Sequence, residues 1–225
     1  MGRSLPRFYA CFVRAESQSA LTEASTRFHE PLYPGSSLPE PWHDGGMQLH
    51  TERLLLREYT LDDFDAVHAF ASDRRIAEFV EWGPNSTADT KKFLEACSSA
   101  QSEPQRRNFT LAITVRKADP IGSVSLSLVS GKGEIGYVVA ADCWGRGYAT
   151  EASQAMLVFG MKDLGLPEIT ATCRPENAAS ARVLEKIGMS RIGLRKADKL
   201  IRGQWRDSLV FSALVPGSCT GQVTA

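Results

Sequence analysis

The segment Glu134–Ala152 constrains the fold more than any other part of the chain. It opens with β-forming residues that have no helical period, and it breaks at a turn in which two glycines flank Arg146. From Tyr148 onward, apolar residues recur at three- and four-residue steps. The pattern therefore predicts a strand, a tight turn and a helix in direct succession.

The predicted turn has the chemistry of an anion site. The first N–H groups of a helix have no partners within the helix, and the helix dipole adds partial positive charge there. Gly145 and Gly147 let the main chain approach a ligand without a Cβ in the way. We therefore expect an anion such as a phosphate to bind at this turn.

Composition limits the partners that such a site could serve. The chain has 225 residues with a formal net charge of zero, and 43% of the residues are hydrophobic. This balance is typical of a globular protein and gives no reason to expect a nucleic acid or a membrane surface as a partner. No apolar run approaches the roughly 20 residues of a membrane-spanning helix. A small acidic molecule would need a local positive site, which the predicted turn supplies.

The cysteines and histidines argue against a metal site. The five cysteines are scattered without a Cys-x-x-Cys pair, and the four histidines all lie in the first third of the chain. Zinc sites need closely spaced ligands of these types. We expect no bound metal, reduced thiols and a cytoplasmic location.

The chain divides into three parts. Residues 1–46 are rich in Ser, Pro, Glu and Gly, which predicts a poorly ordered extension. Met47 opens a segment with the pattern of a folded domain, so translation of the natural protein could also begin there. We expect one domain over residues 47–215, and a polar tail over residues 216–225.

Hydrophobic periodicity predicts an α+β domain. The expected strands are 49–59, 108–115, 121–129, 134–140, 168–173, 189–194 and 206–214. The expected helices are 61–71, 87–101, 148–162 and 177–188. Three of these strands form a meander that leads the chain into the glycine turn.

This order of elements resembles the GNAT fold of N-acetyltransferases. Five local sequences are similar to its RimJ/RimL-like branch, the ribosomal-protein-alanine acetyltransferases. They are Thr51–Arg57, Glu134–Tyr137, Trp144–Ala152, Asn177–Ser180 with Leu184–Met189, and Arg202–Asp207. The resemblance covers about residues 47–215. It implies α/β/α layers around a twisted, mixed and mostly antiparallel sheet of six to seven strands, with about four helices and splayed central strands.

One residue departs from the general superfamily pattern, which is Arg/Gln-x-x-Gly-x-Gly/Ala. Trp144 stands where Arg or Gln is usual, whereas Gly147 and Ala149 stand at the matching positions. An aromatic residue is common there in the RimJ/RimL-like branch, so the departure supports that branch. The cofactor prediction is unaffected, because the phosphate ligands are backbone groups.

Two other phosphate-binding motifs fit this turn less well. A Rossmann turn needs Gly-x-Gly-x-x-Gly, and Thr150 replaces the third glycine. Glu168 lies at the distance of the Rossmann acidic residue, but it begins its strand instead of ending it. A P-loop is excluded because no Gly-Lys-Ser/Thr follows.

The resemblance implies acetyl-CoA as the cosubstrate. Its pyrophosphate would lie on the N–H groups of Gly145, Arg146, Gly147, Tyr148, Ala149 and Thr150, and the Arg146 side chain could add charge at the rim. Its pantetheine arm would fill the gap between the splayed strands, next to Val139, and pair with the main chain of Val138 and Ala140.

Asn177 and Ser180 would then face the thioester. Asn177 is also a natural N-cap for its helix, and that role alone could explain it. Ser180 resembles the branch's candidate for hydrogen bonding to the departing thiolate or protonating it. The alternative is a small polar residue in the first turn of a helix.

Acetyl transfer needs a neutral amine, and Glu134 is the carboxylate best placed to act as its base, directly or through water. The alternative is an exposed glutamate at a strand end. Strand alternation points Tyr137 to the opposite face, so we do not expect it to share the role of Glu134. Trp82, Trp205 and Asp207 are candidates for the edge of the acceptor pocket, with plain packing as the alternative.

The sequence thus predicts an enzyme that moves an acetyl group from acetyl-CoA to a primary amine by direct attack. The acceptor stays open between a protein N-terminus and a small amine, and the assembly between a monomer and a homodimer. The alternative function is a non-catalytic acyl-CoA-binding sensor of the same fold.

Overall fold

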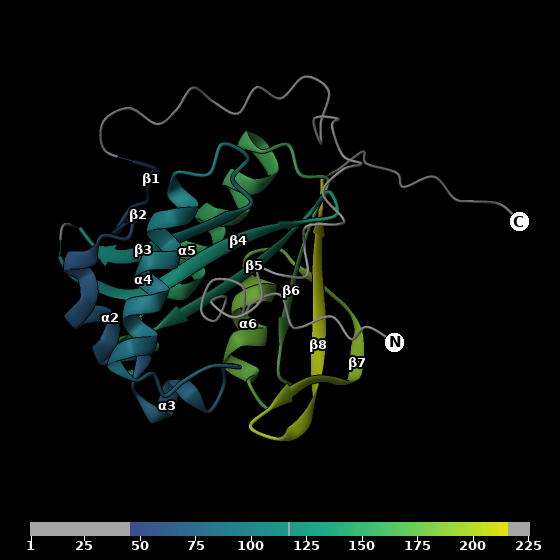
Figure 1. Cartoon of the computed structure of the whole chain (residues 1–225). Helices are drawn as coiled ribbons and strands as arrows, with labels where there is room; N and C mark the ends of the chain where they lie inside the picture. The colour runs from purple at the N-terminus through teal and green to yellow at the C-terminus, as the bar shows by residue number, and fades with distance from the viewer. Residues whose placement is uncertain (1–45, 117, 216–225) are drawn as a thin grey trace, which may run out of the picture.

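A computed structural model describes residues 46–116 and 118–215. In this part of the chain, helices cover both faces of one eight-stranded sheet (Figure 1). The elements are β1 (Gln48–His50), β2 (Leu54–Glu58), α2 (Phe64–Ala71), α3 (Arg74–Ala77), α4 (Thr87–Gln101), β3 (Asn108–Val115), β4 (Pro120–Val129), β5 (Lys132–Val139), α5 (Tyr148–Val158), β6 (Glu168–Cys173), α6 (Ala178–Lys186), β7 (Ser190–Ile201) and β8 (Gln204–Leu214). The predicted α+β class is confirmed.

The strand order is β1-β2-β3-β4-β5-β6-β8-β7. All neighbouring strands are antiparallel except β5 and β6, which are parallel. The sheet has more strands than the six to seven expected, because the segment predicted as one strand folds back on itself. The Thr51 hydroxyl accepts a hydrogen bond from the Leu54 N–H at 2.9 Å, which closes a turn between β1 and β2.

The helices differ from the prediction at their ends. The short helix α3 was not expected; Asp73 caps it by accepting a hydrogen bond from the Arg75 N–H at 2.8 Å. The helix that follows the glycine turn is α-helical to Val158 and continues as a π-helical turn over Phe159–Asp163. Strand β7 runs to Ile201, seven residues beyond the expected Leu194, because β8 pairs with it along most of that length.

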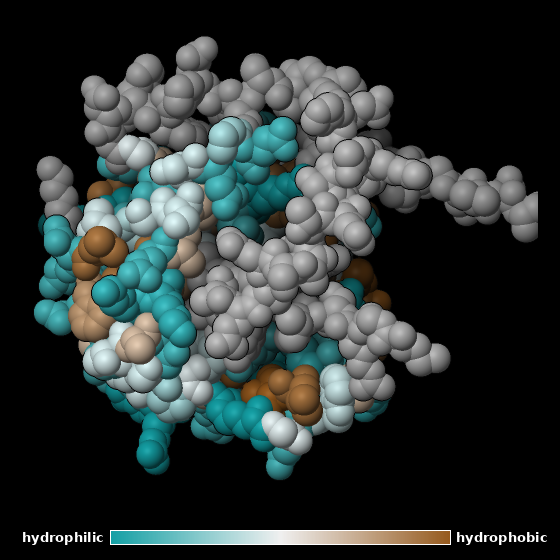
Figure 2. Space-filling view, in the orientation of Figure 1, coloured by the Kyte–Doolittle hydropathy of each residue, from teal (hydrophilic) through white to brown (hydrophobic). Residues whose placement is uncertain are grey.

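Two apolar clusters, one on each face, hold the layers together. Leu111 and Ile113 belong to the larger cluster, with residues of α5 and α6. Ala112, next to them on β3, belongs to the smaller cluster with residues of α2 and α4. Figure 2 shows the result on one side of the molecule, where the coloured surface is mostly hydrophilic and its apolar patches are separate.

The central strands diverge at the middle of the sheet. Strands β5 and β6 pair only at Gly133↔Ile169 and Glu134↔Thr170, although β5 continues to Val139 and β6 to Cys173. This confirms the predicted splay. The opening lies directly before the glycine turn, so it connects that turn with the centre of the sheet.

Within residues 46–116 and 118–215, no helix is long and apolar enough to cross a membrane. The same residues bring together no group of three His, Cys, Asp or Glu side chains that could hold a metal ion. The predicted extension and tail lie outside the described residues, apart from Gly46. The domain limits and the cytoplasmic location stay predictions.

Candidate active site

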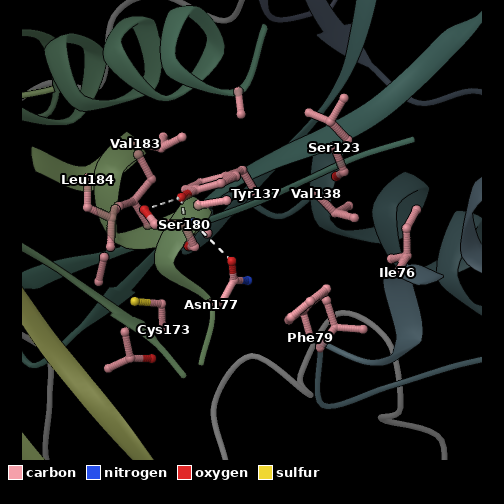
Figure 3. A pocket seen from close by; sticks show the side chains of 18 of the residues that line it. Ile76, Phe79, Ser123, Tyr137, Val138, Cys173, Asn177, Ser180, Val183 and Leu184 are labelled. Atoms are coloured by element: carbon pink, nitrogen blue, oxygen red, sulfur yellow. Dashed lines mark hydrogen bonds between the residues drawn. The ribbon is translucent and has the colours of Figure 1, made fainter. Parts of the chain in front are cut away.

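A groove of about 530 Å3 passes through the opening between β5 and β6 (Figure 3). Its walls come from the glycine turn, β4, β5, β6, α6, the segment after α3, and the β7–β8 hairpin. In Figure 3, Ile76 and Phe79 lie across the groove from Ser180 and Val183. The groove therefore joins residues that are far apart in the sequence.

The glycine turn has the geometry that the sequence predicts. Gly145 and Gly147 have φ angles of +75° and +82°, a left-handed conformation that favours glycine. Gly147 is the N-cap of α5, so the free N–H groups of that helix begin directly after it. Gly145, Gly147, Tyr148, Ala149 and Thr150 line the groove. Arg146 is exposed and is not among the lining residues.

Trp144 fixes the start of this turn. Its indole N–H donates a hydrogen bond to the Val139 carbonyl at 2.7 Å, and its ring meets the Phe79 ring edge-on with centroids 6.4 Å apart. The side chain thus ties the turn to the end of β5. This explains how an aromatic residue can serve at the position where the superfamily usually has Arg or Gln.

Arg53 supports the turn from the other side, and sequence reasoning missed this role. Its Nη1 donates to the Arg146 carbonyl at 2.9 Å, its Nε donates to Glu151 at 2.7 Å, and its guanidinium lies 5.0 Å from the centre of the Tyr148 ring. The turn between β1 and β2 therefore clamps the glycine turn. In the sequence, Arg53 belongs to the Thr51–Arg57 block, which resembles the family, but nothing in that block indicates that it contacts the glycine turn.

Glu151 anchors this clamp. It accepts hydrogen bonds from the Thr51 hydroxyl at 2.6 Å and from the Arg53 N–H at 2.8 Å. Burial raises the pKa of the Glu151 carboxyl, but these bonds and the Arg53 guanidinium outweigh burial, so the pKa is below its ordinary value. The carboxylate therefore stays charged and holds Arg53 in place.

The main-chain pairing predicted for Val138 and Ala140 is corrected. The Ala140 N–H donates to the Ile121 carbonyl, just before the paired part of β4, at 2.7 Å, and β4 pairs with β5 in antiparallel register. Because hydrogen-bonding direction alternates along a strand, Val138 and Ala140 both point toward β4. The groups that face the opening are those of Tyr137 and Val139. The Val138 and Val139 side chains line the groove, whereas Ala140 does not.

Ser180 and Asn177 lie where the prediction expected them, at the start of α6. The Asn177 Oδ1 accepts a hydrogen bond from the Ser180 N–H at 3.0 Å, so Asn177 is the N-cap of the helix. Both residues line the groove. The capping role explains Asn177 fully and also fixes the position of Ser180.

Tyr137 contacts Ser180, which the sequence did not indicate. Its hydroxyl lies 2.8 Å from the Ser180 hydroxyl and donates to the Ser180 carbonyl at 3.0 Å (Figure 3). Burial raises the pKa of Tyr137 far above its ordinary value, although the bond to Ser180 opposes this. Tyr137 therefore keeps its proton and can donate it in a hydrogen bond.

Cys173 lies beside these two residues at the end of β6 and lines the groove. Burial raises the pKa of its thiol to about 11. A thiol needs a lowered pKa to act as a nucleophile at neutral pH, so this cysteine is poorly suited to that role.

Glu134 lies at the last paired position of β5, where β6 leaves it. It is partly buried and lines the groove, and its carboxylate makes no hydrogen bond or ion pair with residues 46–116 or 118–215. Alternation places it on the same face as Val138, which packs on the α2 and α4 cluster, whereas Tyr137 packs on the α5 and α6 cluster. Glu134 and Ser180 therefore approach the opening from opposite faces.

The three candidates for the acceptor edge have different outcomes. Trp82 is buried in the smaller cluster and also lines the groove. Trp205 is 52% exposed on β8 and is not a lining residue. Asp207 is also outside the lining, because its carboxylate pairs with the Lys196 ammonium at 2.6 Å and accepts from the Ala197 N–H. For Trp205 and Asp207 the geometry adds no support, and their place at the acceptor edge stays a prediction.

A glycine turn at a helix N-terminus, joined by splayed parallel strands to a serine and a carboxylate, defines the class of the protein. It has the fold and the groove of an acyl-CoA-dependent N-acetyltransferase. The acetyltransferase (GNAT) domain model matches residues 53–190, more than half of the chain, and the chain belongs to this family.

Individual relatives agree with this assignment. The chain is 33% identical over 171 residues to the uncharacterized N-acetyltransferase YnaD of Bacillus subtilis, covering 75% of this chain and 97% of that protein. A GNAT-family acetyltransferase from Bacillus anthracis superposes with a TM-score of 0.66 at 32% identity, over 75% of this chain and 98% of that one. Mycobacterium smegmatis RimJ, solved in complex with CoA-disulfide, superposes with a TM-score of 0.64 at 25% identity. The match covers 72% of this chain and 82% of that one. The RimJ/RimL proteins are therefore among its structural neighbours.

Proposed function

We propose that this groove binds acetyl-CoA along its length and transfers the acetyl group to a primary amine by direct attack. The observation that carries the proposal is the continuity of the groove from the N-terminus of α5, through the opening between β5 and β6, to Glu134 and Ser180. A molecule with an anionic end and a long neutral arm fits such a path.

The pyrophosphate lies on the N–H groups of Gly145–Thr150 in this proposal, with the Arg53 clamp holding their arrangement. The pantetheine arm takes the place of a missing strand beside β5. Its amides pair with the main-chain groups of Tyr137 and Val139, which β4 leaves unused. The Val139 carbonyl already accepts a hydrogen bond from the Trp144 indole, so at Val139 only the N–H is available to pair with the pantetheine arm.

Glu134 and Ser180, on opposite faces of the opening, act on different groups: Glu134 on the amine and Ser180 on the leaving thiolate. The amine nitrogen bonds to the thioester carbon, and Glu134 takes the proton that the amine loses, directly or through one water. The C–S bond then breaks and leaves a thiolate. When the Tyr137 hydroxyl turns its single proton from the Ser180 carbonyl to Ser180 Oγ, the Ser180 hydroxyl is free to donate a hydrogen bond to this sulfur and to stabilise the thiolate.

The acceptor is a primary amine, from a protein N-terminus or from a small molecule. The [ribosomal protein uS5]-alanine N-acetyltransferase of Escherichia coli, 28% identical over 88 residues, supports a protein N-terminus as the acceptor. An α-amino group, with a reference pKa of about 7.7–8.0, is partly neutral at cellular pH, whereas an alkyl amine near 10.4 depends more on a base. Glu134 therefore matters most for an alkyl amine.

The test is thiol release from acetyl-CoA across a panel of peptides and small amines. We expect release that depends on one class of amine, with equal amounts of thiol and acetylated amine. Binding of acetyl-CoA without turnover on any amine would instead favour a non-catalytic sensor. An absence of any acetyl-CoA-dependent thermal shift would contradict the cofactor assignment itself.

A further inference from the structure

We propose that the preferred acceptor carries a second, protonated nitrogen, as a diamine does, and that Glu81 binds that second nitrogen. This inference rests on the proposed function, because it identifies the substrate class of the same groove. It concerns the part of the groove between the segment after α3 and the β7–β8 hairpin.

Glu81 has one oxygen without a partner. It lines the groove, and its Oε1 forms an ion pair with the Lys199 ammonium from β7. The two side chains are only 15% and 14% exposed. Its Oε2 is buried and accepts no hydrogen bond from the residues that the structure describes. A buried carboxylate oxygen without a donor is costly, so a ligand that brings an N–H group to it gains binding free energy.

The segment that carries Glu81 is held against the sheet. Arg202 donates to the Trp82 carbonyl at 2.9 Å and to the Gly83 carbonyl at 2.8 Å, and Arg174 donates to the Glu78 carbonyl. These bonds fix the main chain on both sides of Glu81. The carboxylate is therefore positioned before a ligand arrives, which lowers the entropic cost of binding.

On the side of the groove that carries Glu81, each basic side chain has an acidic neighbour. The charged side chains that line the whole groove are Glu81, Glu134, Arg174, Arg182, Lys186 and Lys199. Arg182 and Lys186 belong to α6, which packs on the opposite face of the sheet. Lys199 is paired with Glu81, and Arg174 lies 3.6 Å from Glu176. Glu134 remains as one uncompensated negative charge.

The reacting amine must be neutral when it attacks, so it does not balance the negative charge of Glu134. A second ammonium on the same acceptor balances it, because an alkyl amine with a pKa near 10.4 is protonated at neutral pH. A carboxylate close to the reacting amine would be repelled by Glu134. Trp82 and Phe93, which belong to one apolar cluster, also line the groove and offer apolar surface to the methylene chain between two nitrogens.

The experiment compares three acceptors on the unaltered chain: a linear diamine, the monoamine of the same length, and an uncharged peptide with a free N-terminus. We expect kcat/KM for the diamine to exceed that for the monoamine by about tenfold or more. Glu81→Gln should remove most of this preference by raising KM for the diamine, with KM for acetyl-CoA unchanged. Glu78→Gln is the matched control, because Glu78 lies on the same segment with an exposed side chain.

The outcomes separate this inference from the proposed function. Equal kcat/KM for diamine and monoamine, or a clear preference for the peptide, overturns the inference while acetyl transfer stands. Binding of acetyl-CoA without acetylation of any amine overturns the proposed function as well. Glu81→Gln leaves Lys199 buried without its partner, so its folding is checked by thermal unfolding. If it does not fold, the comparison of acceptors on the unaltered chain decides.

Discussion

The two ends of the groove are built in different ways. The cofactor end comes from one continuous stretch, Val139 to Thr150, and offers main-chain groups at left-handed glycines. The proposed acceptor end is assembled from the segment after α3 and from β3, β4, β5, β7 and β8, and it offers side chains. A main-chain site is encoded locally and tolerates many side chains. A side-chain site depends on tertiary contacts and can change with single substitutions.

The largest effect should come from Gly147→Asp. An aspartate is strained at φ +82°, and its carboxylate would stand beside the Arg53 guanidinium, where the phosphate is expected. We expect calorimetric affinity for acetyl-CoA to fall by about 100-fold or more. Gly165→Asp is the control, since Gly165 also has a positive φ (+63°) but lies in open space outside the groove. Equal losses in both variants would mean that backbone strain alone is responsible.

Ser180→Ala should separate chemistry from binding. Removal of a proton donor to the leaving group costs roughly 100-fold in kcat, whereas KM for acetyl-CoA should stay the same. Tyr137→Phe should give a smaller loss, because Ser180 keeps its proton and loses only the hydroxyl that orients it. Steady-state kinetics on the best amine checks both, with the exposed Ser190→Ala as control. Unchanged turnover in Ser180→Ala would remove this residue from the mechanism.

Arg53→Met should weaken the cofactor end alone. Without its bonds to the Arg146 carbonyl and to Glu151, the phosphate turn loses its clamp, and KM for acetyl-CoA should rise by about tenfold. The value of kcat should change little, and so should KM for the amine. Arg195→Met, at an exposed position on β7, is the matched control. A fall in kcat with KM unaltered would show that Arg53 acts on the chemistry and not on the turn.

The smallest predicted effect is a pH-dependent change in the stability of the fold. The pKa of Glu151 is lower in the folded protein than in the unfolded chain, so its carboxylate stabilises the fold above the unfolded value of about 4.3. This stabilisation is lost as the pH falls through the lower, folded pKa. Glu151→Gln should therefore unfold at lower urea concentration than the unaltered chain near neutral pH, and the difference should shrink in acid. The exposed Glu185→Gln should behave like the unaltered chain at every pH; a constant difference for Glu151→Gln would contradict the ionic account.

The contrast between the two ends also explains what could be predicted from the sequence. Strand, turn and helix around Gly147 follow from periodicity and from glycine chemistry, which are local properties. The clamp could not be predicted, because Arg53 and the Arg146 carbonyl meet only when the turn between β1 and β2 reaches the N-terminus of α5. The contact between Tyr137 and Ser180 likewise joins a strand and a helix 43 positions apart.

Two differences from the expected arrangement have a similar origin. Alternation correctly places Glu134 and Tyr137 on opposite faces, but it does not tell which main-chain groups point to β4. That choice depends on the register with β4, and it moves the expected pairing from Val138 and Ala140 to Tyr137 and Val139. Asp207 belongs to a motif typical of the branch, yet here Lys196 takes its carboxylate. Motifs indicate a family, whereas register and partners determine each role.

A crystal structure of the chain with acetyl-CoA tests the account most directly. We expect the pyrophosphate on the N–H groups of Gly145–Thr150, the pantetheine arm in the opening between β5 and β6, and the thioester between Glu134 and Ser180. Pyrophosphate density away from the glycine turn, or a thioester more than one water from both Glu134 and Ser180, would contradict it.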